Sequence, residues 1–282
     1  MKKFFVLSVL ITSLLVSSIA MVSAKELASH IMVQDNFQSG LGQWKVAINA
    51  AEDRAGLDAD TVTQRVQVVD APGMPQGHKA VQFVVPHTEG QFRSEIAQPH
   101  EEGFHERWYA ARVYIPQDWV FDTDSGNDIF LQWHAILGNE RVDRDFPNLS
   151  ISVDGDKYVI KRSFGSVADI QRDSRALDQP VQKGVWSSWV VHARWSSASD
   201  GQVEVWKDGK SVWKVNGPNA YTTRPRTPYF KTGIYHPQWK LKYGELKTGL
   251  VKERKILITD VKIGNEQANY NDMMPKDDLP KE

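Results

Sequence analysis

Short stretches in which apolar and polar residues alternate limit the fold of this sequence more than any other feature. Such alternation places successive side chains on opposite faces of a β-strand. We expect strands at residues 80–85, 91–96, 108–115, 128–134, 149–153, 158–162, 189–195, 203–206, 212–215, 229–235 and 255–263. Turn signals separate several of them, and Asp208-Gly209 is a typical hairpin turn. Many short strands joined in this way favour an all-β protein, a β-sandwich or jelly roll.

The first 24 residues have the pattern of an export signal. Lys2 and Lys3 precede an apolar run that ends in the small residues Val22, Ser23 and Ala24. We expect cleavage after Ala24, a single domain over residues 25–282, and a secreted or periplasmic protein without membrane contact after cleavage. A membrane anchor is the alternative, but the apolar run is short and contains several Ser and Thr.

The charge balance of the chain indicates which partners to expect. The 34 basic and 35 acidic residues give a formal net charge of −1, which does not favour a nucleic-acid partner. The chain has no Cys, so its core must stabilise it without disulfides. Ten Trp, eight Tyr and eleven Phe supply large apolar side chains for that core and flat rings on which sugars stack. We expect a monomer.

Three of the expected strands each present one polar and one mainly apolar face. In residues 91–96, Gln91, Arg93 and Glu95 share a face, because residues two apart in a strand point the same way. By the same spacing, residues 130, 132 and 134 (Phe, Gln, His) share a face, and so do residues 229, 231, 233 and 235 (Tyr, Lys, Gly, Tyr). Basic and aromatic side chains beside Gln and His suit a concave groove that holds a sugar ring and its carboxylate.

These segments resemble the signature strands of jelly-roll alginate lyases, with the patterns Arg-(Ser/Thr)-Glu-Leu-Arg, Gln-(Ile/Val)-His and Tyr-Phe-Lys-Ala-Gly-x-Tyr-Asn-Gln. This chain has Arg-Ser-Glu-Ile-Ala at residues 93–97, Gln-Trp-His at 132–134 and Tyr-Phe-Lys-Thr-Gly-Ile-Tyr-His-Pro at 229–237. The chain is even more similar to the group that contains heparin lyase I and glucuronan lyases, which shares the Gln-Trp-His form. Ala97 and the His236-Pro237 pair depart from the alginate-lyase patterns at positions that read the substrate.

The resemblance implies an enzyme that cleaves a uronate-containing acidic polysaccharide by β-elimination. It assigns Arg93 and Gln132 to the substrate carboxylate. Tyr235 is the expected acid, and also the base for substrates whose C5 proton and O4 lie on the same side of the ring. His134 is the expected base when they lie on opposite sides. Glu95 is expected to orient Arg93 through an ion pair.

Further residues are candidates for contact with the substrate. Lys231 is expected to bind it and to influence Tyr235, while Tyr229 is either a substrate contact or a packed aromatic. His87 is a second candidate for the base. His236 and Arg226 are sugar contacts or loop residues.

The sequence leaves the substrate and two other activities open. Glucuronan is the first choice of substrate and alginate the second. A glycoside hydrolase would need a carboxylate pair, but Glu95 is the only acidic residue in the three motifs; a carbohydrate-binding module would not need His and Tyr together. We expect no required cofactor and no catalytic metal. Residues 122–128 are acidic and turn-like and leave a structural calcium ion possible, although their Gly is misplaced for an EF-hand.

Overall fold

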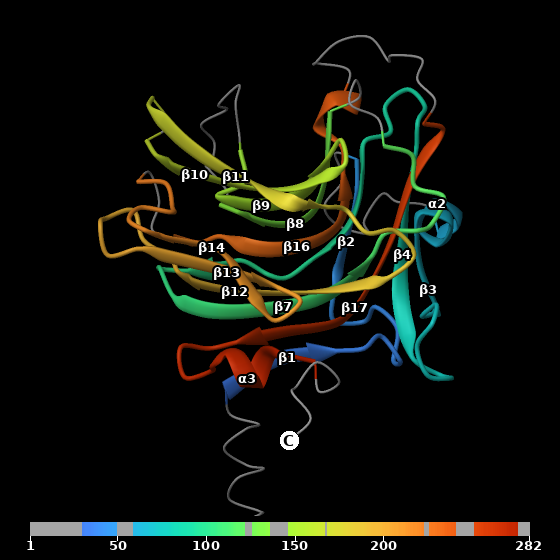
Figure 1. The fold of residues 1–282 in the computed structure, drawn as a ribbon, viewed down its shortest axis with the longest axis horizontal. Coiled ribbons are helices and arrows are strands. Elements are labelled where there is room, and N and C mark those ends of the chain that lie inside the picture. The colour runs from blue at the N-terminus through green and yellow to red at the C-terminus, as the bar shows by residue number, and fades with distance from the viewer. Residues whose placement is uncertain are drawn as a thin grey trace, which may run out of the picture.

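A computed structural model describes residues 30–49, 59–121, 126–135, 146–166, 168–222, 226–240 and 251–275. Over these residues the chain is almost entirely β-structure, arranged as two stacked antiparallel sheets in a jelly-roll sandwich (Figure 1). The predicted fold class is therefore confirmed. The proposed signal peptide at residues 1–24 lies outside the described residues.

The larger sheet contains, in spatial order, β14 (Lys210–Asn216), β13 (Gln202–Lys207), β12 (Trp186–Arg194), β7 (Glu106–Tyr114), β17 (Glu253–Gly264), β4 (Lys79–Pro86) and β3 (Val66–Asp70), and β1 (Ile31–Asp35) pairs with β17. The second sheet contains β11 (Ile170–Pro180), β10 (Lys157–Gly165), β9 (Leu149–Asp154), β8 (Asn127–His134), β16 (Tyr229–Tyr235), β5 (Arg93–Ala97) and β2 (Lys45–Ile48). The small elements are the ribbon of β6 (Glu101–Glu102) with β15 (Arg226–Thr227), the helices α2 (Ala59–Arg65) and α3 (Tyr270–Met273), and the 3₁₀ turn η1 (Pro237–Trp239).

One hydrophobic core fills the space between the sheets. It combines Tyr109 from the larger sheet with Trp133 and Phe230 from the second, and their rings lie 5.2–5.7 Å apart. Because the apolar face of each sheet is used here, the polar face of the second sheet points outward. Helix α3 packs against β7 and β17, on the outer face of the larger sheet.

The turns form where the sequence predicted them. The β13–β14 hairpin turns at Asp208 and Gly209, both with positive φ (48° and 80°), as expected of a type I′ turn. All eleven predicted segments are strands, with ends that differ by at most a few residues. Strands β1, β2, β3 and β11 and the two-residue strands β6 and β15 were not predicted. In β11 most side chains are exposed and polar, so this edge strand shows no alternation.

One predicted side-chain direction is wrong. Phe130 was expected beside Gln132 on the outer face, but it lies in the core against Tyr158 and Trp189. The pairing of β8 with β9 shifts register between Ile129 and Leu131. Such a bulge reverses the direction of the side chains on one side of it, which alternation alone does not reveal.

Candidate functional site

The three strands that carry the sequence motifs are neighbours in the second sheet. Their order is β8, β16, β5, although long stretches of sequence separate them. Tyr235 pairs with Arg93 across β16 and β5, and Lys231 pairs with Gln132 across β16 and β8. The fold therefore brings these four residues onto one outer face of three adjacent strands.

Glu95 lies at the centre of this group and is only 1% exposed. Its Oε1 accepts a hydrogen bond from the Gln132 amide. Its Oε2 lies 3.7 Å from Arg93 Nε and 4.0 Å from Lys231 Nζ, and accepts no hydrogen bond from any residue that the structure describes. The expected ion pair with Arg93 is thus present. Since a buried carboxylate is costly without cations and donors around it, Glu95 holds all three partners in place. We call these four residues the Glu95 cluster.

A glycine allows the strands to approach closely behind the cluster. Gly233 pairs with Glu95 in the register of β16 and β5, and its φ is +143°. A Cβ atom at this position would lie 2.3 Å from the backbone oxygen of Ser94 and 2.6 Å from the Cα of Glu95. Any side chain here would push β5 away from β16 and separate Arg93 from Tyr235.

Arg65 supports β5 from the core side, and the sequence contains no motif that pointed to it. Its guanidinium donates to the backbone oxygen of Arg93 at 3.0 Å, to the hydroxyl of Ser94 at 3.0 Å and to the backbone oxygen of Val84 at 2.6 Å. Burial lowers the pKa of Arg65 to about 10. This buried cation fixes the backbone from which the Arg93 side chain projects.

Tyr235 lines an open cleft of about 420 Å³ on the outer face of the second sheet. The lining residues come from five strands and the segments that join them: Asn127, Ile129, Phe146, Pro147, Ser150, Lys161, Ser163, Arg172, Tyr235, Pro237 and Gln238. The Tyr235 ring packs edge-on against Phe92, and Lys240 Nζ lies 5.0 Å from its centroid. The phenol therefore stands in a hollow that is open to a ligand. Lys161 and Arg172 belong to no motif that the sequence analysis recognised.

Tyr229 and His134 lie at the other end of the same strands. They pair in the register of β16 and β8, with ring centroids 6.3 Å apart. The Tyr229 ring also contacts the His100 ring at 3.9 Å and has Lys231 Nζ 4.9 Å from its centroid. With 6% exposure, Tyr229 is largely packed. A second hollow of about 190 Å³, lined also by Lys45, lies beside Tyr229 and Lys231.

The two other histidine candidates flank Trp239. His87 stacks on the Trp239 ring at 4.2 Å, and its Nδ1 lies 2.8 Å from the backbone oxygen of Val251. His236 is completely buried, and its Nδ1 lies 2.7 Å from Asp128 Oδ1. The sequence analysis left His236 as a sugar contact or a loop residue. Contact with a sugar does not fit this placement, because the buried His236 ring links η1 to β8 through Asp128.

Arg226 lies in the small ribbon and forms an ion pair across it. Its Nη2 is 2.6 Å and its Nε 3.0 Å from the carboxylate of Glu102. Arg226 does not belong to the Glu95 cluster and does not line the cleft. This pairing favours the loop-residue alternative of the sequence analysis.

Two kinds of feature are absent from the residues that the structure describes: a group of metal ligands and a helix that could cross a membrane. No three His, Asp or Glu side chains within this part of the chain gather as metal ligands. Residues 122–125 of the acidic run lie outside it, and Asp128 is paired with His236 and Arg254. No described helix is both long and apolar enough to cross a membrane.

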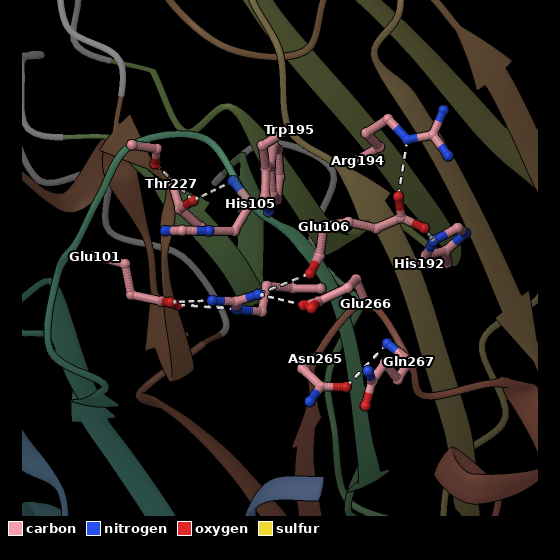
Figure 2. Close-up of polar contacts among 12 residues, drawn as sticks. Glu101, His105, Glu106, His192, Arg194, Trp195, Thr227, Asn265, Glu266 and Gln267 are labelled. Carbon is pink, nitrogen blue, oxygen red and sulfur yellow. Dashed lines mark hydrogen bonds and ion pairs between the residues drawn. The ribbon is translucent and has the colours of Figure 1, made fainter. Parts of the chain in front are cut away.

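A second carboxylate-centred cluster lies on the opposite side of the sandwich. Glu106 begins β7 and lies between His192 and Arg194 of β12 (Figure 2). His192 Nε2 is 2.7 Å from Glu106 Oε1, and Arg194 Nε donates to Glu106 Oε2 at 2.8 Å. The His192 ring stacks on Trp108 at 4.1 Å. We call Glu106, His192 and Arg194 the Glu106 cluster.

Residues 40–262 match a family model described as polysaccharide lyase. No curated protein sequence matches the chain.

Solved structures with the same fold include enzymes and a binding domain. An endo-β-1,4-glucuronan lyase from the fungus Trichoderma reesei superimposes with a TM-score of 0.66 at 19% identity, over 87% of this chain and 99% of that one. An alginate lyase from Pseudomonas aeruginosa gives a TM-score of 0.50 at 14% identity, over 80% and 99%. The binding domain of Paraclostridial Mosquitocidal Protein 1 gives 0.52 at 9% identity, over 88% and 51%. Likenesses at this level of identity concern the fold, and residues must decide the chemistry.

Proposed function

The chain belongs to the polysaccharide lyase family, and from this premise we propose that it cleaves a uronate-containing acidic polysaccharide by β-elimination beside Tyr235. One observation supports this most strongly. The Glu95 cluster holds two cations, Arg93 and Lys231, around a single buried carboxylate on the sheet face where Tyr235 lines an open cleft.

The first requirement of the reaction is to neutralise the substrate carboxylate. The C5 proton of a uronate is weakly acidic while that carboxylate is charged, because its removal places further negative charge on the same group. Arg93 and Gln132 would stabilise this charge as it develops. The Glu95 cluster orients the Nε edge of Arg93 and the Gln132 amide. A guanidinium carries five N–H donors and an amide two, so both groups have the capacity to bind a second carboxylate.

The second requirement is a proton acceptor and a proton donor. A base takes the C5 proton, and the electron pair of the broken C5–H bond forms the C4–C5 double bond. The C4–O4 bond breaks as an acid protonates O4. In a glucuronate, the C5 proton and O4 project from the same side of the ring. Tyr235 would therefore serve as both base and acid. His134 would be the base for uronates in which the two lie on opposite sides, and His87 is the reserve candidate.

We propose β-1,4-glucuronan as the first substrate and alginate as the second. The Gln-Trp-His motif, the His-Pro departure and the likeness to a glucuronan lyase support this order. Lys231, a member of the Glu95 cluster, would bind the substrate, and Tyr229 would form the wall of the site beside Lys231. With the signal expected at residues 1–24, the enzyme would act outside the cytoplasm as a monomer, without a required cofactor.

The two alternative functions have less support. A glycoside hydrolase needs two carboxyl groups on either side of the scissile bond, yet no Asp or Glu is among the residues that line the described cleft. A carbohydrate-binding module would not need a tyrosine hydroxyl in the cleft, on the strand position that pairs with Arg93.

A panel of polysaccharides tests the proposal. The purified protein is incubated with glucuronan, with alginate and with soluble cello-oligosaccharides, which carry a hydroxymethyl group where glucuronan carries its carboxylate. We expect ultraviolet-absorbing unsaturated ends from glucuronan and none from the neutral chains. New reducing ends without this absorbance would instead identify a hydrolase, and binding without either product would identify a binding module.

A further inference from the structure

The cleft beside Tyr235 continues away from the Glu95 cluster towards the far edge of the sheet. In the register, Lys231 pairs with Gln132, Gln132 with Ser150, and Ser150 with Lys161. These residues form one row across β16, β8, β9 and β10. Neighbouring strands lie about 4.8 Å apart, so the backbones of Lys231 and Lys161 are separated by roughly 14 Å.

Two cations stand at the far end of this row. Lys161 lines the cleft, and its side chain is 25% exposed. Arg172 of the neighbouring strand β11 lines it too, with its guanidinium carbon 3.8 Å from the centre of the Phe146 ring. Lys161 Nζ lies 3.8 Å from the carboxylate of Asp154, which is beyond hydrogen-bonding distance. Asp154 therefore holds Lys161 only loosely.

The pKa of Lys161 reflects both its burial and the nearby charge of Arg172. Burial lowers this pKa, Asp154 opposes the effect, and the charge of Arg172 lowers it further. Because the two cations repel each other, an anion between them would relieve the repulsion. The rest of the lining suits a sugar ring, with apolar surface from Phe146 and hydroxyls from Ser150 and Ser163.

We propose that Lys161 and Arg172 form a subsite that binds the carboxylate of a uronate residue remote from the bond being cleaved. The subsite rests on the proposed function, because it requires a substrate with a carboxylate on successive sugars. Tyr235 on β16 also lies three strands from Lys161 on β10, so at least roughly 14 Å separates their backbones, which is more than a single sugar ring spans. The enzyme would thus recognise several consecutive uronates.

Charge-neutral variants test the subsite. Lys161→Gln combined with Arg172→Gln should raise KM for long glucuronan about tenfold, as expected for the loss of two partly exposed charged contacts, while kcat stays within about twofold. The apparent affinity of the double variant should also depend less on salt than that of the wild type. Arg175→Gln is the matched control, because Arg175 lies on the same strand, pairs with Asp178 and does not line the cleft.

The possible outcomes separate the subsite from the proposed function. An unchanged KM in the double variant, or an equal rise in the Arg175→Gln control, overturns the subsite while cleavage by the wild type leaves the function intact. If the wild type cleaves no polymer, affinity electrophoresis in glucuronan decides. Retardation of the wild type but not of the double variant supports the subsite without the reaction, and equal or absent retardation rejects it.

Discussion

The Glu95 and Glu106 clusters each place a carboxylate among cationic and nitrogen-bearing side chains. They lie on opposite faces of the sandwich, and their carboxylates differ in hydrogen bonding and in burial. Both oxygens of Glu106 have a nitrogen partner within 2.8 Å. In the Glu95 cluster, Oε2 lies 3.7 Å from Arg93 Nε and 4.0 Å from Lys231 Nζ. Glu106 is partly exposed, whereas Glu95 is buried.

The arrangement of the partners differs as well. In the Glu106 cluster, His192 and Arg194 each lie beside a different oxygen of the carboxylate, so that both oxygens have a partner. In the Glu95 cluster, Arg93 and Lys231 both approach one oxygen, Oε2, of a buried carboxylate. The Glu106 cluster joins two strands of the larger sheet, whereas we propose that the Glu95 cluster, on the face with the cleft, serves an anionic ligand.

The largest expected difference between the two faces is in catalytic rate, when one tyrosine hydroxyl is removed from each face. We expect Tyr235→Phe to lower the rate of unsaturated-product formation by about 10²–10⁴-fold, since it removes the proposed proton-transfer group. Its free energy of unfolding should change by less than about 0.5 kcal/mol. Tyr270→Phe is the matched control, because Tyr270 packs against Trp206 on the opposite face; it should keep full activity.

A Tyr235→Phe variant that keeps more than a tenth of the wild-type rate would contradict the assignment. Binding of glucuronan to this variant should persist, which distinguishes loss of chemistry from loss of the site.

Removal of the central carboxylate from each cluster should give the next largest contrast, in stability. Glu95→Gln removes the charge of the buried carboxylate that lies near Arg93 and Lys231, so we expect a loss of about 3 kcal/mol in urea unfolding, together with a loss of activity. Glu106→Gln should cost less than about 1 kcal/mol, because its partners are partly exposed, and should leave activity unchanged. Equal losses in the two variants would remove the distinction between the clusters.

The sequence was sufficient to predict the strands that carry the Glu95 cluster and the faces of most of their side chains. Strand β16 begins and ends at the predicted residues, because its alternation is regular and its apolar face is buried. Phe130 was misplaced because a bulge is a property of the pairing between two strands. The burial of His236 depends on Asp128, which is 108 residues away.

The far end of the cleft was beyond sequence reasoning for a different reason. Arg172 lies in an exposed edge strand without alternation, and Lys161 becomes a cleft residue only because β10 lies three strands from β16 in the sheet order. Spatial order of this kind follows from the topology of the whole sheet. Local patterns predict the strands, but not which distant cations share one row.

The smallest expected effect concerns how the Glu106 cluster responds to acid. Burial by itself raises the pKa of Glu106, but the hydrogen bonds and positive charges of Arg194 and His192 outweigh it, so the pKa lies below its ordinary value of 4.5. A carboxyl whose pKa is lowered in the folded state stabilises the protein above the unfolded-state pKa, and this contribution is lost as the pH falls through the folded-state pKa.

The difference in free energy of unfolding between wild type and Glu106→Gln should therefore be largest near neutral pH and shrink below about pH 4. Urea unfolding at a series of pH values measures it, and the total change should remain below about 1 kcal/mol because the cluster is partly exposed. A difference that stays constant from neutral to acidic pH would mean that Glu106 contributes through packing alone, and its two hydrogen-bonded ion pairs would then no longer distinguish this cluster from the Glu95 cluster.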